Sequence, residues 1–175
     1  MKFNHRTLLA GKSKTYISVD GTDCPIQEPH PHDPSFFSFK IKAAALRYEV
    51  DVAVHTGFIV WVSGPYPAGT PDITIFRDGL EQALLPTEKV VADKGYQGEE
   101  CIQTPGSGSL FRNKQQQKIR SRQENVNRRL NIFKCLYNTS RHDNGKHEYM
   151  FFSVAVIVQI DFLPNGCLYD IDYYF

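Results

Sequence analysis

Alternating apolar and polar residues in the first third of the chain predict three consecutive β-strands. The run from Thr15 to Asp20 alternates and meets a turn-like Asp-Gly-Thr-Asp sequence, so we expect a strand that carries Asp20 at its carboxyl end. Two apolar runs, Leu46 to Val54 and Phe58 to Val62, flank His-Thr-Gly and predict a β-hairpin. The three strands are expected to be antiparallel.

The middle of the chain predicts a loop, a helix and a further strand. Glycines and prolines from Gly64 to Pro71 indicate the loop, and Asp72 is placed to begin a helix that Pro86 ends. Lys89 to Ala92 forms a compact apolar strand, which Asp93 follows directly. A second carboxylate is therefore expected at a strand end.

The last third predicts a loop, two helices and a closing strand. Residues 103–118 are rich in Gly, Ser and Gln and are expected to form a mobile loop. Apolar residues recur at helical spacing from Arg120 to Tyr137, and Glu124 lies off that stripe. A helix from about His147 to Ile160 is apolar nearly all round and is expected to be buried. A turn then leads to an edge strand from Leu168 to Tyr173.

Length and composition fit one globular domain. The chain has 175 residues, of which 41% are hydrophobic and 22% charged, with a net charge of +1. We expect a short N-terminal extension over residues 1–14 and one domain over residues 15–175. The longest purely apolar run, Val154 to Val158, is far below the roughly 18 residues that indicate a membrane span, and the first residues do not resemble a signal peptide. We therefore expect a soluble, intracellular protein with no membrane partner.

Two features that can indicate metal binding carry little weight here. The four cysteines are far apart in the sequence, so we expect free thiols rather than a zinc site or a disulfide framework. The segment from His30 to Asp33 offers two imidazoles and a carboxylate, but its interleaved prolines favour an extended surface loop over a metal clip.

Positive charge is concentrated in one part of a nearly neutral chain. From Phe111 to Lys146 there are ten basic and two acidic residues, a local net charge of +8, and Glu124 is one of the two acids. The surplus indicates either a solvated helix face or a surface that contacts phosphates.

Three carboxylates are candidates for one site. Asp20 and Asp93 follow strands, and Glu124 is carried by a helix in a basic setting. Carboxylates that converge raise one another's pKa, and divalent cations such as Mg²⁺ relieve this repulsion. Three acids in a chain that holds 19 Asp and Glu are weak evidence by number, so their position at strand ends carries the argument.

Four short blocks follow one another along the chain in a specific order. They are Val19-Asp20-Gly21-Thr22, the loop from Gly64 to Asp72 continuing into Ile75-Phe76, the run from Val91 to Tyr96, and the run from Arg122 to Leu130. Together they resemble the catalytic blocks of DDE-superfamily transposases, closest to the eukaryotic PIF/Harbinger-like endonuclease group. The resemblance extends from about Lys14 to about Tyr173.

This resemblance implies an α/β protein of the RNase H-like fold, with a mixed five-stranded sheet flanked by helices. It also implies a metal-dependent DNA endonuclease that hydrolyses phosphodiesters with two Mg²⁺ (or Mn²⁺) ions and can transfer DNA strands. By position, Asp20, Asp93 and Glu124 match the catalytic, metal-binding acids of the family. Asp72 matches a further acid of the loop motif, and its alternative role is that of a helix N-cap.

The resemblance makes DNA the expected partner and the nucleus the expected location. Candidate phosphate contacts are Lys94, Arg128, Arg129 and Lys134. Transposases of this kind carry a DNA-binding region upstream of the first aspartate, and here about fourteen residues precede the first strand. A partner chain then supplies DNA specificity, the module has been lost, or the gene model is truncated. A homo-oligomer is also expected from the family.

Two interpretations compete with an active nuclease. One is a domesticated or truncated, non-catalytic descendant that serves as a DNA-binding or interaction module. The other is a relic without function. The presence of all three acids argues against the first, and the intact apolar patterning argues against the second.

Overall fold

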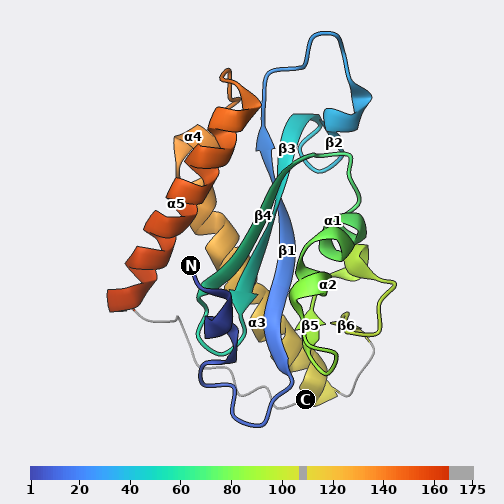
Figure 1. Cartoon of the computed structure of the whole chain (residues 1–175), viewed down its shortest axis with the longest axis vertical. Coiled ribbons are helices and arrows are strands. Elements are labelled where there is room, and N and C mark those ends of the chain that lie inside the picture. Colours follow the sequence, from blue (N-terminus) through green and yellow to red (C-terminus); the bar gives the residue numbers. More distant parts are fainter. Residues whose placement is uncertain (107–109, 166–175) are drawn as a thin grey trace.

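A mixed β-sheet forms the centre of the computed structural model, which describes residues 1–106 and 110–165 (Figure 1). Within these residues the sheet has six strands in the order β2-β3-β1-β5-β6, and β4 pairs with β3. β1 with β3 and β3 with β4 are antiparallel, as predicted, whereas β5 is parallel to β1 and to β6. The bounds are β1 (Thr15–Pro25), β2 (Phe37–Ser38), β3 (Ala43–Ala53), β4 (Ile59–Pro67), β5 (Lys89–Val91) and β6 (Ile102–Gln103).

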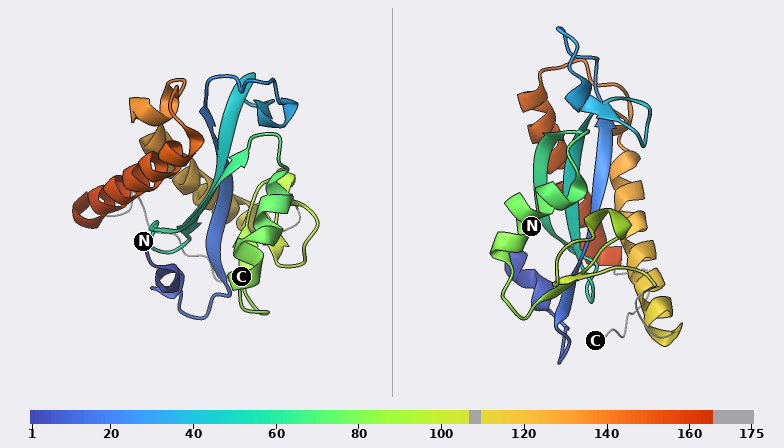
Figure 2. Two further views of the ribbon diagram at one scale, coloured as in Figure 1. Left: turned by 45° about the horizontal axis from the view of Figure 1, so that its top comes forward. Right: turned by 90° about the vertical axis from the view of Figure 1, so that its right-hand side faces the viewer.

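Helices cover both faces of the sheet, so the predicted mixed α/β architecture is confirmed, although the sheet has six described strands where five were expected. On one face lie α1 (Asp72–Asp78) and α2 (Leu80–Ala83), and on the other lie α3 (Leu110–Asn131), α4 (Lys134–Tyr137) and α5 (Asn144–Asn165), as the two views of Figure 2 show. Three short 3-10 helices complete the described elements: η1 (Phe3–Thr7), η2 (Pro34–Phe36) and η3 (Lys94–Tyr96).

The alternation of side chains along the central strands creates two cores. Even-numbered residues of β3, such as Tyr48 and Val50, pack with α3, α4 and α5, and the ring of Tyr48 stacks on Phe151 of α5 at 3.8 Å between centroids. Odd-numbered residues of β1, such as Ile17 and Val19, pack with α1, α2 and η3. Successive strand residues point to opposite faces, so Asp20 faces the α3 side.

β1 continues past the expected turn, which corrects the prediction that it ends at Asp20. Asp20 is opposite Val50 of β3, and the pairing runs on through Gly21 and Thr22 to Pro25. The Asp-Gly-Thr-Asp sequence stays extended because β3 is long enough to pair with it throughout. Asp20 therefore lies within a strand, although it is beyond the part of β1 that pairs with β5.

β4 is also longer than predicted, because residues 64–67 extend it into the segment expected to be a loop. An edge strand tolerates its prolines, and a register shift accommodates them. Gly64 is required there: its φ is +131°, and a Cβ would come within 2.7 Å of the Tyr48 ring and 2.9 Å of the Arg47 carbonyl oxygen.

α3 begins ten residues earlier than the helix predicted from Arg120, so residues 110–118 of the expected loop are helical. Glutamine, lysine and arginine are good helix formers, and Gln115, Gln116 and Ile119 are buried against the rest of the fold. The helix ends at Asn131, so Lys134–Tyr137 forms a separate short helix rather than a continuation.

α5 is longer and more exposed than predicted. It runs from Asn144 to Asn165, through the first two residues of the expected turn. One face is buried through residues such as Phe151 and Val158, whereas Tyr149 and Ile160 are 77% and 57% exposed, so the expectation of burial all round was wrong. Within the described residues, no helix is long and apolar enough to cross a membrane. The predicted strand from Leu168 to Tyr173 lies outside the described residues.

The N-terminal segment packs on the sheet through η1. The guanidinium of Arg6 donates to both carboxylate oxygens of Glu88, at 2.9 and 3.2 Å, and this ion pair is buried. Arg6 also lies over the ring of Phe3, which makes an edge contact with Trp61 of β4.

Candidate active site

All three predicted catalytic acids line one pocket of about 250 Å³. Asp20 comes from β1, Asp93 lies two residues after the end of β5, and Glu124 comes from α3. Segments separated by some seventy and thirty residues thus meet at one place, between the sheet and α3. The pocket is also lined by Ser18, Val19, Lys40, Ala92, Arg120 and Gln123.

Strand register brings the two aspartates together. In the parallel pair of β1 and β5, Ser18 lies opposite Val91. Asp20 and Asp93 each come two residues after that pair, so their side chains leave the backbone at the same level of the sheet. The carboxylate of Asp93 accepts a hydrogen bond from the Gly95 N–H at 2.7 Å, which begins η3 and fixes the side chain.

Buried polar anchors position Glu124 on α3. The neighbouring Gln123 donates from its Nε2 to the Val50 carbonyl of β3 at 2.8 Å, and Arg122 donates to the Val54 carbonyl. These two bonds fix the rotation of α3 against the sheet. Because the anchored residues immediately precede Glu124, its exposed side chain is held along the rim of the pocket.

The pKa of Asp20 is strongly perturbed. Burial raises its pKa to about 6; the positive charge of Lys40 opposes the rise, and the negative charge of Asp93 adds to it. Its Oδ2 accepts a hydrogen bond from Nδ2 of Asn127 at 2.7 Å, which orients the carboxylate. The sequence contained a signal for Asn127, since it follows Glu124 by three residues on the same helix.

Two cations in the pocket escaped the sequence analysis. Lys40 reaches the pocket from the turn between β2 and β3, and its ammonium donates to the Gly21 carbonyl at 3.3 Å. Arg120 lies one helical turn before Glu124 on α3 and is exposed. The position of Lys40 depends on tertiary packing and has no local signal, whereas Arg120 was identifiable from its spacing to Glu124.

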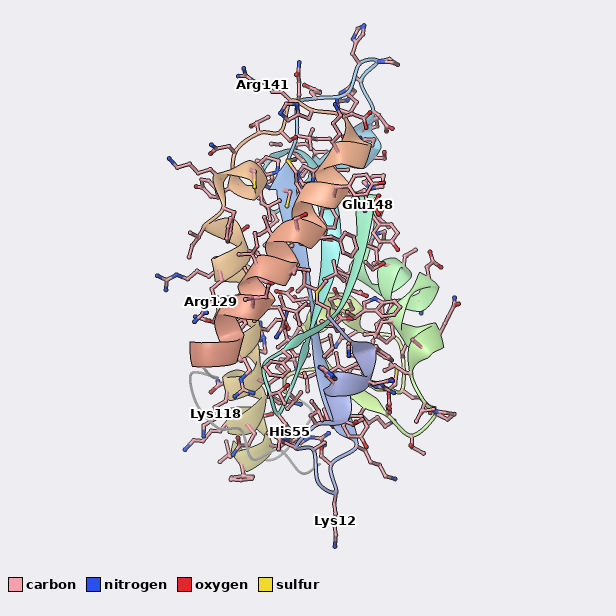
Figure 3. The ribbon with its side chains drawn as sticks, turned by 60° about the vertical axis from the view of Figure 1, so that its left-hand side comes forward. Lys12, His55, Lys118, Arg129, Arg141 and Glu148 are labelled. Atoms are coloured by element: carbon pink, nitrogen blue, oxygen red, sulfur yellow. The ribbon has the colours of Figure 1, made fainter. Side chains whose placement is uncertain are left out.

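The four predicted phosphate contacts lie in different settings. Lys94, Arg128 and Lys134 are exposed, and Arg128 is one turn after Glu124 on the same face of α3. Arg129 instead donates to Asp161 of α5 at 2.6 Å and lies over the Phe162 ring at 4.4 Å, beside α5 in Figure 3. A phosphate contact by Arg129 would require it to leave these two partners.

Asp72 does not cap its helix, because Pro71 occupies the N-cap of α1 and Asp72 is the first helical residue. Its carboxylate instead accepts a hydrogen bond from Arg47 at 3.0 Å. It lies so close to β1 that a Cβ on Gly21 would be 2.9 Å from its Oδ1. Burial raises the Asp72 pKa, Arg47 opposes the rise, and Asp93 adds to it. Asp72 therefore affects the electrostatics of the pocket, although it lies on the opposite face of β1.

A pair of buried carboxylates on β3 was not foreseen. Glu49 and Asp51 are 1% and 0% exposed, and none of their four carboxylate oxygens has a hydrogen-bond partner among the described residues. Burial raises the pKa of Glu49 to about 8, with a further rise from Asp72. Burial and then Glu49 raise the pKa of Asp51 well above its ordinary value. Burial therefore favours the neutral form of both groups.

The chemistry of the pocket suits a divalent cation, although no group of three or more His, Cys, Asp or Glu side chains in the described part of the chain is already arranged to hold one. Three carboxylates line the pocket, and carboxylate oxygen is the ligand that Mg²⁺ prefers. The raised pKa of Asp20 reflects a cost of burying negative charge, which a bound cation would remove.

The other candidate metal ligands stay apart from this pocket. Cys24, Cys101 and Cys135 are free thiols, as expected, and Cys167 lies outside the described residues. In the proline-rich loop, the exposed His32 ring contacts Glu28 at 2.6 Å.

The acidic pocket is formed by the long strand β1, the end of its parallel neighbour β5, and helix α3. Residues 19–159 match the family described as DDE superfamily endonuclease, so the chain belongs to this family. The mixed sheet flanked by helices agrees with its RNase H-like fold. The chain is also 31% identical, over 140 residues, to a protein of Microchaete diplosiphon described as a probable transposase for insertion sequence element IS702. That match covers 72% of this chain and about half the length of the relative.

Proposed function

We propose that the chain is the catalytic domain of a transposase-type endonuclease, which hydrolyses phosphodiester bonds in DNA. The observation that carries the proposal is the meeting of Asp20, Asp93 and Glu124 in one pocket next to Lys40 and Arg120. Family membership and the likeness to a probable transposase support the reaction class.

Asp20, Asp93 and Glu124 would hold Mg²⁺ or Mn²⁺, as two ions, which supply Lewis acidity that lowers the pKa of a water and stabilises a leaving oxygen. Lys40 and Arg120 would attract the DNA phosphate to the pocket, and Asn127 holds the Asp20 carboxylate in place. Gln123 and Arg122 keep α3, and with it Glu124, against β3.

In the hydrolytic step, a water oxygen forms a bond to phosphorus and the bond from phosphorus to the 3′ oxygen breaks. The water loses a proton, and the departing oxygen gains one to become a 3′ hydroxyl. That hydroxyl is the nucleophile expected for transfer of the strand to target DNA, which exchanges one phosphodiester bond for another.

The partners follow from this role. DNA is the substrate, and a homo-oligomer or a separate DNA-binding protein would bring the paired ends together. A nuclear location remains a prediction that rests on the resemblance to the eukaryotic group.

Nicking of supercoiled plasmid by the purified chain tests the proposal. We expect nicked product with Mg²⁺ or Mn²⁺ and none with EDTA, and a gel that resolves joined products detects strand transfer. A folded protein that binds DNA in a salt-dependent manner yet nicks no plasmid in either metal would contradict it. That outcome would identify a non-catalytic DNA-binding module.

A further inference from the structure

A second, larger pocket adjoins the catalytic one. It has a volume of about 800 Å³, within the range of about 300 to 1,000 Å³ that bound small molecules occupy in proteins. Lys40 lines both pockets, so the two pockets are neighbours on the surface of the protein.

The outer wall of the larger pocket is built by the segment that joins α4 to α5. Ser140 in this segment is bonded to the end of β1 on both sides: its N–H donates to the Pro25 carbonyl at 2.9 Å, and its carbonyl accepts from the Gln27 N–H at 2.8 Å. This parallel bridge fixes the neighbouring residues Tyr137 to Arg141 as part of the wall. Figure 3 shows Arg141 at this end of the molecule, far from Lys118 near the start of α3.

The side chains that line the larger pocket are complementary to a nucleotide. Lys40 and Arg141 offer positive charge to phosphate, and Asn131 and Asn138 present the paired donors and acceptors that base edges require. Tyr137 lines the pocket and is 67% exposed, so it supplies an accessible aromatic side chain at the pocket.

The one carboxylate in the lining, that of Asp23, is already paired with an arginine. Asp23 accepts hydrogen bonds from Arg47 at 2.7 and 3.0 Å and from the Ser38 hydroxyl at 2.5 Å. Arg47, which also pairs with Asp72, therefore offsets part of the negative charge that Asp23 presents to a phosphate in the pocket.

The turn between β2 and β3, which carries Lys40 to both pockets, alternates exposed apolar and basic residues, Phe39, Lys40, Ile41 and Lys42. Phe39 is 75% exposed, and the ammonium of Lys42 lies 5.8 Å from its ring centroid. Exposed aromatic rings next to lysines are the combination that proteins use to bind single-stranded nucleic acid.

We propose that the larger pocket binds the unpaired nucleotide next to the phosphate in the catalytic pocket, with its base stacked on Tyr137. The proposal rests on the endonuclease function proposed above. A base inside a duplex is covered by its neighbours, so a pocket of this size admits a base only after it has left the stack.

Binding of a fluorescent single-stranded oligodeoxynucleotide of about ten nucleotides tests the pocket without cleavage, because the titration is made in EDTA. Tyr137→Ala is expected to weaken binding at least about fivefold, the lower end of what removal of one stacking aromatic does. Tyr137→Phe keeps a ring and should bind like the original protein. Tyr149→Ala removes a comparably exposed tyrosine, 77% exposed on α5, and should leave affinity unchanged.

A second readout reports the base directly. 2-Aminopurine, placed in a short unpaired tract of a DNA duplex, loses fluorescence when it stacks on an aromatic ring. We expect quenching with the original protein and with Tyr137→Phe, and none with Tyr137→Ala. Equal affinity and equal quenching in Tyr137→Ala would overturn the proposal.

The two proposals fail separately. If the protein binds the oligonucleotide and quenches 2-aminopurine in EDTA but never nicks plasmid, the result supports the nucleotide pocket and contradicts the nuclease function. If the protein nicks plasmid in Mn²⁺, and Tyr137→Ala binds the oligonucleotide and quenches 2-aminopurine as the original protein does, the result supports the nuclease function and contradicts the nucleotide pocket.

Discussion

Asp20 and Asp93 line the same pocket because each follows a member of the paired residues Ser18 and Val91, on the parallel strands β1 and β5, by two positions. Asp20 is held on one side by the continuing pairing of β1 with β3 and is oriented by Asn127. Asp93 is held by the Gly95 N–H. The two carboxylates therefore depend on a backbone register, and Glu124 is added to them by the packing of α3.

Asn127 is expected to matter for activity although it carries no charge. Loss of its hydrogen bond to Asp20 in Asn127→Ala should lower the rate of plasmid nicking by about 10- to 100-fold, as removal of a group that orients a metal ligand does. Initial rates over a range of Mn²⁺ concentrations measure the effect. Asn125→Ala, which removes a partner of Arg129 on the same helix, is the control. An unchanged rate in Asn127→Ala would contradict the role assigned to this contact.

DNA binding should depend on the exposed arginines beside Glu124. Arg120→Ala and Arg128→Ala are each expected to make the negative slope of log affinity against log salt less steep by about 0.9, the value for one lost phosphate contact in duplex DNA. Arg129→Ala should change the slope less, because its guanidinium already contacts Asp161 and Phe162. Anisotropy titrations at several salt concentrations give the slopes. Three equal slopes, matching that of the original protein, would exclude these arginines as phosphate contacts.

Arg47 is expected to be essential for stability. It donates to Asp23 on β1 and to Asp72 and the Thr70 carbonyl near α1, so it joins the sheet to the helix layer. Arg47→Ala leaves the buried Asp23 carboxylate without its cation and should lower the free energy of unfolding by about 3 kcal/mol. Urea denaturation measures the loss. Arg77→Ala removes an exposed arginine paired with Glu99 and should cost well below about 1 kcal/mol. Similar losses in the two variants would contradict the account.

The buried pair on β3 predicts an unusual dependence of stability on pH. The folded-state pKa of Glu49 is about 8, above its ordinary value of 4.5, so the unfolded chain releases this proton first as pH rises. The free energy of unfolding should therefore fall between about pH 5 and pH 8. The double variant Glu49→Gln, Asp51→Asn keeps similar shapes without titration, and its fall over this range should be much smaller. Urea denaturation at a series of pH values provides the test, and parallel curves for the two proteins would contradict it.

Local patterns predicted the elements of the site, and tertiary pairing decided their lengths. The apolar runs before Asp20 and Asp93 indicated strands, and helical spacing placed Glu124 off the apolar stripe. The sequence could not show that β1 continues beyond Asp20, because only the long β3 keeps the following Gly21 extended.

The contacts around the acids were harder to predict for a similar reason. Lys40 enters the pocket from a distant turn, and Arg47 pairs with Asp72 across 25 positions of sequence, so neither has a local signal. The acids Glu49 and Asp51 interrupt an apolar strand at alternate positions, which places them on one face but does not show that this face is buried.

The most direct test of the central claim is plasmid nicking in Mn²⁺ by Asp93→Asn beside the matched variant Asp78→Asn. Both substitutions remove one negative charge at similar size, but Asp93 lines the pocket and Asp78 is exposed at the end of α1. We predict that nicking disappears in Asp93→Asn and persists in Asp78→Asn, with both proteins folded. Nicking by Asp93→Asn at the rate of the original protein would contradict the assignment of this pocket as the active site.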